Sequence, residues 1–139
     1  MPVTEVFICT TCRPALAARD APPAGQALLE AVQDAVRRSA QAQEGETCAS
    51  RPGPLVRGIA CMSSCSRACT VAFQAPGKQT YVFGDLQADA VTAEHVLACA
   101  VMHQRSADGL LPRKERPERL RQGILAKLPP LADSLRLAP

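Results

Sequence analysis

The sequence predicts a single α/β domain, and two observations carry this prediction. Short runs rich in β-branched and aromatic residues alternate along the chain with longer stretches whose apolar residues recur at helical spacing. Strands that alternate with helices are typical of an α/β sheet. The length of 139 residues, 47% of them hydrophobic, fits one globular domain and argues against a disordered chain.

The first half of the chain predicts a strand, a helix and a second strand. Residues 3–8 form the first strand and residues 55–60 the second. A helix is predicted over about 23–41, because its apolar residues repeat on one face. These residues are Leu28, Leu29, Val32, Ala35 and Val36. Residues 42–54 are polar and rich in turn formers, which indicates a solvated loop.

The second half predicts a β-hairpin and two helices. Residues 69–74 and 79–83 are typical of strands, and the Pro-Gly turn at 75–78 joins them. Helices are predicted over about 88–104 and about 117–127. The apolar residues assigned to their buried faces are Val96, Leu97, Ala100 and Val101 in the first, and Leu120, Ile124 and Leu128 in the second.

The order of these elements is the outline of a thioredoxin-like domain, in which a βα unit is followed by a β-hairpin and a helix. We assign this domain to residues 1–110, and residues 111–139 to a short basic C-terminal helical extension packed on it. Residues 1–112 hold nine Lys and Arg against ten Asp and Glu, whereas residues 113–139 hold seven against three. The excess of positive charge therefore belongs to the extension, which is not the pattern of a nucleic-acid-binding domain.

Five of the seven cysteines stand in two groups, each at the end of a predicted strand. The first group is Cys9-x-x-Cys12 and the second is Cys61-x-x-x-Cys65-x-x-x-Cys69. Because the ends of parallel strands meet at one edge of a sheet, the two groups are expected to lie together. Several soft thiolates around one cation suit an iron–sulfur cluster or zinc, and four is the usual number for either. The sequence therefore predicts a metal centre, with small neighbours whose amides can donate to the sulfurs.

Five motifs give the chain a resemblance to a known family. They are Cys-x-x-Cys-Arg, Cys-x-x-x-Cys-x-Arg-x-Cys-Thr-Val-Ala, Ala-Pro-Gly-Lys, Tyr-Val-Phe-Gly-Asp-Leu and Glu-Arg-Pro-Glu, at residues 9–13, 61–72, 75–78, 81–86 and 115–118. This set resembles the bacterial family of predicted metal-binding proteins known as domain of unknown function 1636. The pattern around Cys61 and Cys65 also resembles the thioredoxin-like [2Fe-2S] ferredoxins. Gln79 and Arg113 stand where members of the family are expected to have tryptophan.

The resemblance implies a thioredoxin-like ferredoxin fold and a [2Fe-2S] cluster held by Cys9, Cys12, Cys61 and Cys65, with Cys69 as the alternative ligand in place of Cys12. The protein would then be an electron carrier or a redox or metal accessory, linked to cobalamin and cobalt metabolism. Ferredoxins of this type also imply a homodimer. No catalytic residue is assigned and no independent enzyme is expected, since the sequence lacks a Ser/His/Asp set, a glycine-rich phosphate loop and paired carboxylates.

Two other functions fit the same cysteines. A structural or regulatory zinc module would use the same four thiolates, because zinc and iron–sulfur clusters both accept four cysteines. A dithiol oxidoreductase would use Cys9 and Cys12 as its redox pair. Pro14 and a loop separate Cys12 from the predicted helix, which departs from the thioredoxin arrangement.

The remaining thiols and the two histidines receive structural interpretations. Cys99 is predicted to be a buried core thiol, and Cys48 an incidental thiol in a polar loop. His95 and His103 are predicted to be solvated or half-buried rather than metal ligands.

The cations near the cysteines and in the extension suggest a partner. Arg13 and Arg67 are either plain surface residues or charges that raise the reduction potential of a cluster. The basic stripe is a solvated helix face or a docking patch for an acidic redox partner. Its members are Arg113, Lys114, Arg116, Arg119 and Arg121. With no secretory signal and no apolar run of about 18 residues, we expect a cytoplasmic protein that binds neither membrane nor nucleic acid.

Overall fold

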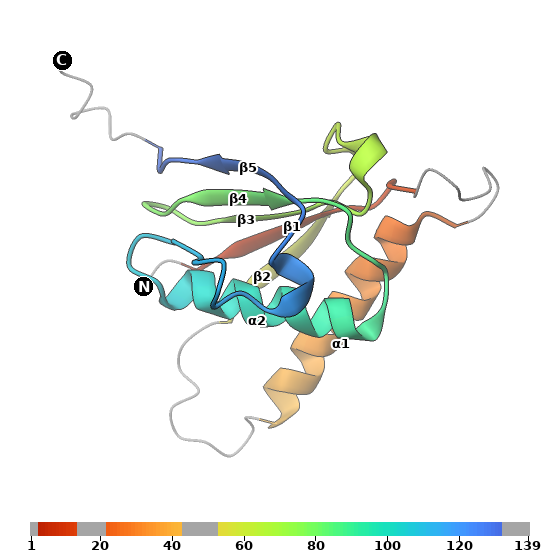
Figure 1. Cartoon of the computed structure of the whole chain (residues 1–139). Helices are drawn as coiled ribbons and strands as arrows, with labels where there is room; N and C mark the ends of the chain where they lie inside the picture. Colours follow the sequence, from red (N-terminus) through yellow and green to blue (C-terminus); the bar gives the residue numbers. More distant parts are fainter. Residues whose placement is uncertain (1–2, 14–21, 43–52, 132–139) are drawn as a thin grey trace.

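Five β-strands form one sheet, and two α-helices lie on one face of it (Figure 1). The computed structural model describes residues 3–13, 22–42 and 53–131. In chain order the elements are β1 (Glu5–Cys9), α1 (Ala24–Ala42), β2 (Leu55–Ile59), the 3₁₀ turn η1 (Cys65–Arg67), β3 (Val71–Gln74), β4 (Thr80–Phe83), α2 (Ala90–Arg105), the 3₁₀ turn η2 (Glu118–Leu120) and β5 (Ile124–Leu128). Within these ranges no helix has the length and apolar character needed to cross a bilayer.

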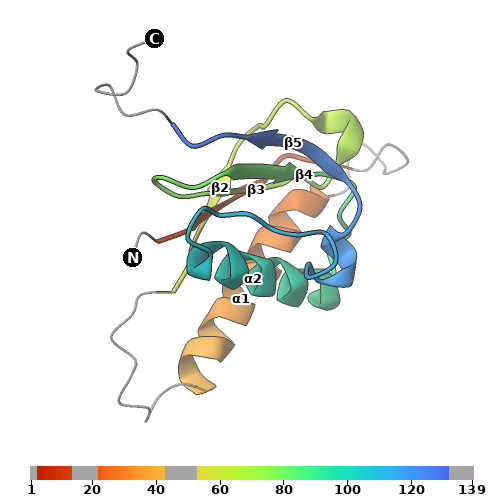
Figure 2. The ribbon, with the colours of Figure 1, turned by 60° about the vertical axis from the view of Figure 1, so that its left-hand side comes forward.

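The strand order across the sheet is β2-β1-β3-β4-β5. β1 and β2 are parallel, with Glu5 opposite Leu55 and Cys9 opposite Ile59. Two parallel strands need a long crossover connection, and α1 lies in it. Every other neighbouring pair is antiparallel. Figure 2, turned from the first view, again shows α1 and α2 beneath the same face, so no described helix covers the opposite face.

The core lies between the sheet and the two helices. Val6 and Ile8 of β1 and Val71 and Phe73 of β3 are fully buried in it. Alternate residues of each strand face the helices, because side chains alternate across a strand. The helices contribute further fully buried residues, which are Leu28 and Val32 of α1 and Val96, Cys99 and Ala100 of α2. Cys99 is thus the buried core thiol that the sequence predicts.

Most of the predicted elements are confirmed, and the mixed α/β class with them. Four strands and two helices form within two residues of the predicted limits, namely those expected near 3–8, 55–60, 69–74, 79–83, 23–41 and 88–104. The predicted loop over 42–54 lies mostly outside the described residues, and so does Cys48.

The predicted helix over 117–127 is wrong. Only Glu118–Leu120 form a turn of 3₁₀ helix, while Ile124–Leu128 form β5 and pair antiparallel with β4. Gly123 separates the two with a φ of 83°, a conformation that ends a helix. The pairing satisfies backbone groups of β4 that would otherwise lie on an open edge. Leu120 is buried as predicted, whereas Ile124 and Leu128 are exposed.

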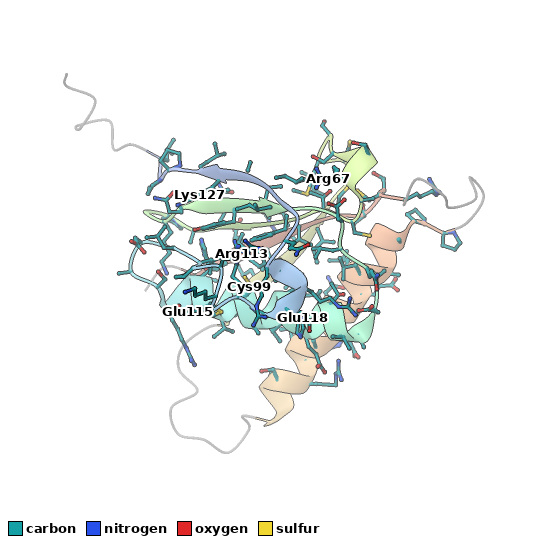
Figure 3. The ribbon with its side chains drawn as sticks, viewed as in Figure 1. Arg67, Cys99, Arg113, Glu115, Glu118 and Lys127 are labelled. Carbon is teal, nitrogen blue, oxygen red and sulfur yellow. The ribbon has the colours of Figure 1, made fainter. Side chains whose placement is uncertain are left out.

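The predicted basic stripe is interrupted, because Arg116 is buried. Its guanidinium lies over the ring of Phe83, 5.4 Å from the centroid. Its Nη2 donates to the Arg121 carbonyl at 3.4 Å, and Nε of Arg121 donates in return to the Arg116 carbonyl at 3.0 Å. Figure 3 shows Glu118 on the turn η2, which packs beside α2. The other cations of the stripe are exposed, namely Arg113, Lys114, Arg119 and Arg121.

His103 is fully buried, which corrects the prediction of a solvated or half-buried side chain. Its Nδ1 lies 2.7 Å from Thr4 Oγ1, and its Nε2 lies 2.6 Å from the Gln79 carbonyl oxygen. Since a carbonyl can only accept, Nε2 carries the proton and Nδ1 accepts from the Thr4 hydroxyl. Lys78 encloses this end of α2 by donating from Nζ to the His103 carbonyl at 3.0 Å. His95 is half-buried, as predicted.

The burial of His103 predicts a loss of stability in mild acid. Burial lowers the pKa of His103 despite its hydrogen bond to Gln79, and the charge of Lys78 lowers it further. Below about pH 6.5 the unfolded chain therefore binds a proton that the folded chain excludes, so the free energy of unfolding should fall as the pH drops. Urea unfolding at about pH 7.5 and about pH 5.5 should show a smaller fall for His103→Gln than for the wild type.

The control for this experiment is Gln87→Ala, at an exposed position without a titratable group, which should keep the wild-type difference between the two pH values. An equal fall in the wild type and in His103→Gln would contradict the assignment of a buried neutral imidazole at position 103.

Candidate metal centre

Cys9 and Cys12 are held between the end of β1 and the first turn of α1. Cys9 is the last residue of β1, and the Gly25 N–H at the start of α1 donates to the Cys12 carbonyl at 3.1 Å. The approach is so close that a Cβ on Gly25 would lie 1.8 Å from the Cys9 carbonyl oxygen. Glycine at position 25 therefore allows the helix to begin directly against the loop that carries the two cysteines.

The loop after β2 lies beside the loop after β1. Thr10 donates to the Ile59 carbonyl from its N–H at 2.9 Å and from its hydroxyl at 3.2 Å. The Thr11 hydroxyl donates to the Ala60 carbonyl. The two chain segments therefore stay in contact beyond Cys9 and Ile59, which are the last paired residues of the parallel strands. Cys61 is the next residue of the chain, so the two cysteine groups begin at the same edge of the sheet.

Backbone N–H groups of the second loop reach two sulfur atoms. The Met62 N–H donates to the Cys9 sulfur, and the Ser63 N–H donates to the Cys61 sulfur at 3.3 Å. Ser63 has a φ of 58°, a left-handed conformation that is uncommon for residues other than glycine. Hydrogen bonds of this kind stabilise negative charge on sulfur.

Three of the described thiols at this edge are buried. Cys9 and Cys12 are each 1% exposed and Cys69 is fully buried, whereas Cys61 is exposed. The Cys12 thiol forms a hydrogen bond with the Cys9 sulfur, and its own sulfur lies 4.0 Å from the Thr70 hydroxyl oxygen. The Cys9 N–H donates to the Thr70 carbonyl at 3.1 Å, so the chain entering β3 closes this side of the site.

The pKa values of Cys9 and Cys12 are shifted in opposite directions. Burial raises the pKa of Cys9, but hydrogen bonds, chiefly from Cys12 and Met62, outweigh it and bring that pKa below its ordinary value. Burial and the neighbouring Cys9 sulfur raise the pKa of Cys12 to about 12. Burial and the charge on Cys9 raise the pKa of Cys69 to about 11. Cys9 is thus the most acidic of the three buried thiols at this edge.

The structure brings some of the predicted ligands together and leaves others apart. Cys9 and Cys12 are in hydrogen-bond contact, and Cys69 is close enough to Cys9 for their charges to interact. Cys61 lies on the adjoining loop, and Cys65 begins η1, with a side chain outside the described set. Among the side chains that are described, no three His, Cys, Asp or Glu groups are arranged to hold one metal ion. Cys12 and Cys69 remain two alternatives for the fourth ligand.

Cys99 does not belong to this edge. It lies within α2. Figure 3 shows it well separated from Arg67, which lies between Cys65 and Cys69 in the segment that joins β2 to β3. Burial raises the pKa of Cys99 to about 12. A buried thiol with a raised pKa is chemically inert, which agrees with its predicted role in the core.

An ion pair that the sequence does not predict lies beside the loop that carries Cys61 and Cys65. Arg67 of η1 and Asp85 after β4 form this ion pair in direct contact with each other. Gly84 and Asp85 are residue types common in turns, but no spacing rule connects position 67 with position 85. The predicted neighbour of a cluster, Arg67, therefore has a carboxylate partner that only the folded chain reveals.

The fold and the site define a small α/β protein with a thiol-rich sheet edge. Residues 6–130 match the family described as Protein of unknown function (DUF1636). Because this match covers most of the 139 residues, the chain belongs to that family, and the resemblance drawn from its motifs is confirmed. No curated protein and no solved structure matches the chain.

Proposed function

We propose that the chain is a thioredoxin-like metal protein whose cysteine edge holds a [2Fe-2S] cluster, and that it acts as an electron carrier or a redox or metal accessory. The observation that carries this proposal is the cluster of buried thiols around Cys9, with an N–H donor from Met62 aimed at its sulfur. A site that gathers thiols, stabilises charge on sulfur and excludes water suits a metal–thiolate centre.

The sheet topology supports the thioredoxin-like part of the proposal. The order β2-β1-β3-β4 combines a parallel βαβ unit with an antiparallel hairpin, and the following helix α2 returns to the face that α1 covers. β5 adds a fifth strand at the edge beyond β4. The cysteines then lie where β1 and β2 end, next to the start of α1.

The donor set fits an iron–sulfur cluster in its chemistry. The ligands would be Cys9, Cys61 and Cys65, with either Cys12 or Cys69 as the fourth. Thiolates are soft donors, and every candidate is a cysteine, which favours a cluster or zinc over magnesium or calcium. When bound, a [2Fe-2S] cluster supplies transfer of one electron.

The residues of the chain itself would stabilise and shield such a centre. The Met62 and Ser63 N–H groups donate to sulfur, and donation of this kind helps to set a reduction potential. The burial of Cys9, Cys12 and Cys69 keeps water from that side, while the exposed Cys61 leaves one side open to a redox partner.

A dithiol oxidoreductase is the second candidate, because the Cys12 thiol hydrogen-bonds to the Cys9 sulfur as in a redox pair. The burial of the two cysteines argues against this function. Thiol–disulfide exchange requires direct attack between sulfur atoms, and both cysteines are 1% exposed, so a partner's disulfide could not reach either without opening of the loop. A ligand role needs no such access.

Anaerobic purification followed by an absorption spectrum and by iron, zinc and acid-labile sulfide analysis tests the proposal. We expect a red-brown protein with about two iron and two sulfide per chain, as a [2Fe-2S] cluster requires. A colourless protein with one bound zinc ion would contradict the cluster and support the structural or regulatory zinc module. A metal-free protein with a reducible Cys9–Cys12 disulfide would support the oxidoreductase and contradict the metal centre.

A further inference from the structure

The ion pair between Arg67 and Asp85 sits at the junction of two segments that are far apart in sequence. Arg67 is the last residue of η1, within the segment from Cys65 to Cys69, and Asp85 follows β4. Figure 3 shows Arg67 on the turn that projects at this end of the sheet. Both side chains are about half exposed, so the pair is a surface feature and not part of the core.

The contact is bidentate and is reinforced by the backbone. Nε of Arg67 lies 2.9 Å from each carboxylate oxygen of Asp85, and Nη2 also donates to Oδ2. The Asp85 N–H donates to the Arg67 carbonyl at 2.7 Å. Next to this pair, Cys69 and Leu86 exchange two hydrogen bonds, of 3.0 and 3.2 Å. The segment around Arg67 and the segment after β4 are thus joined at two points, the ion pair itself and the contact between Cys69 and Leu86.

The segment after β4 is shaped for this approach. Asp85 has a φ of 60°, and a Cβ on Gly84 would lie 2.7 Å from the Arg67 carbonyl oxygen. An aspartate is one of the few residues other than glycine that adopt this conformation readily. Both the missing side chain at position 84 and the unusual backbone at position 85 serve the contact with Arg67.

We propose that Arg67 and Asp85 form a latch that holds the turn carrying Cys65 and Cys69 against residues 84–86, and so keeps the second cysteine group at the site. Arg67 and Asp85 are positioning residues, and their effect on metal retention rests on the proposed function. A direct influence of the Arg67 charge on the metal is the alternative, but the carboxylate of Asp85 neutralises this charge at contact distance.

The test uses the full chain with matched substitutions. Asp85→Asn removes the negative charge but keeps the side-chain shape and tolerates the left-handed backbone. Arg67→Gln removes the cation, whereas Arg67→Lys keeps the charge and loses the bidentate geometry. The control is Asp34→Asn, which breaks two exposed ion pairs on α1, with Arg37 at 3.5 Å and Arg38 at 3.6 Å.

The first measurement is amide hydrogen exchange at Cys69 and Leu86 in the metal-free protein. We expect exchange about 5-fold faster in Asp85→Asn and in Arg67→Gln, and unchanged in the control, which is the size of effect that an exposed ion pair supports. If both variants exchange these amides at the wild-type rate, the latch is overturned, whether or not the protein binds metal.

The second measurement is the rate at which zinc-loaded protein releases Zn²⁺ to a coloured chelator. Release should be about 10-fold faster in Asp85→Asn and in Arg67→Gln, and intermediate in Arg67→Lys. If Arg67→Lys releases Zn²⁺ at the wild-type rate, the charge at position 67 is sufficient and the bidentate geometry is not needed for metal retention. If all three variants release Zn²⁺ at the wild-type rate, the latch has no role in metal retention. If the wild-type protein is purified without iron and also takes up no zinc while exchange is faster in the variants, the proposed function fails and the latch is supported.

Discussion

Cys9→Ser protein should be purified with almost no bound metal. Cys9 lies at the centre of the site, because it accepts from Met62, is in hydrogen-bond contact with Cys12 and interacts with the buried Cys69. Serine is a harder and far less acidic donor, so the substitution removes a soft ligand at the centre of the set. Metal analysis and the visible spectrum of the anaerobically purified variant should both show the loss, with the far-ultraviolet circular dichroism unchanged.

The matched control is Cys99→Ala, which removes another fully buried thiol, from the helix side of the core. We expect it to keep the full metal content and to lose about 1 kcal/mol of stability. Wild-type metal content in Cys9→Ser, or loss of metal in a folded Cys99→Ala protein, would each contradict the location of the site.

Gly25→Ala is expected to destabilise the fold by about 3 kcal/mol and to disturb the thiols at the same time. The new Cβ would lie 1.8 Å from the Cys9 carbonyl oxygen, which belongs to the backbone and cannot rotate away. The start of α1 and the loop after β1 must move apart, at the cost typical of overpacking. Urea unfolding measures the loss of stability, and the rate of Cys12 alkylation should rise as the loop opens.

Gly53→Ala provides the comparison for this prediction. A Cβ at position 53 has no neighbour within 4 Å, so its stability should stay within about 0.5 kcal/mol of the wild type. Equal stabilities of the two variants would show that α1 does not begin directly against the Cys9 carbonyl.

The elements that local pattern decides were predictable, and those that depend on distant partners were not. The faces of α1 and α2 and the alternation in β1 follow from residue spacing alone. In contrast, Leu120, Ile124 and Leu128 have the spacing of a helix face, yet Gly123 and the open edge of β4 turn the last stretch into a strand. Propensity within the segment could not reveal that β4 lacked a partner on that side.

The placement of individual side chains, at the site and away from it, shows the same division. The position of Cys9, Cys12 and Cys61 at one edge could be expected, because each group follows a strand and the two strands are parallel. The burial of His103 could not, since it depends on Thr4 and Gln79 meeting the end of α2. These contacts join residues separated by tens of positions, and no periodicity in the sequence encodes them.

X-ray absorption spectroscopy of the purified protein, recorded at the absorption edge of the bound metal, tests the central claim most directly. It identifies and counts the atoms bound to the metal. If the thiols around Cys9 hold the metal, the first shell consists of sulfur at about 2.3 Å, as in metal–thiolate sites. The same spectrum from Cys99→Ala should be identical to that of the wild type. A first shell made of nitrogen and oxygen, with no sulfur, would contradict a metal centre built from these cysteines.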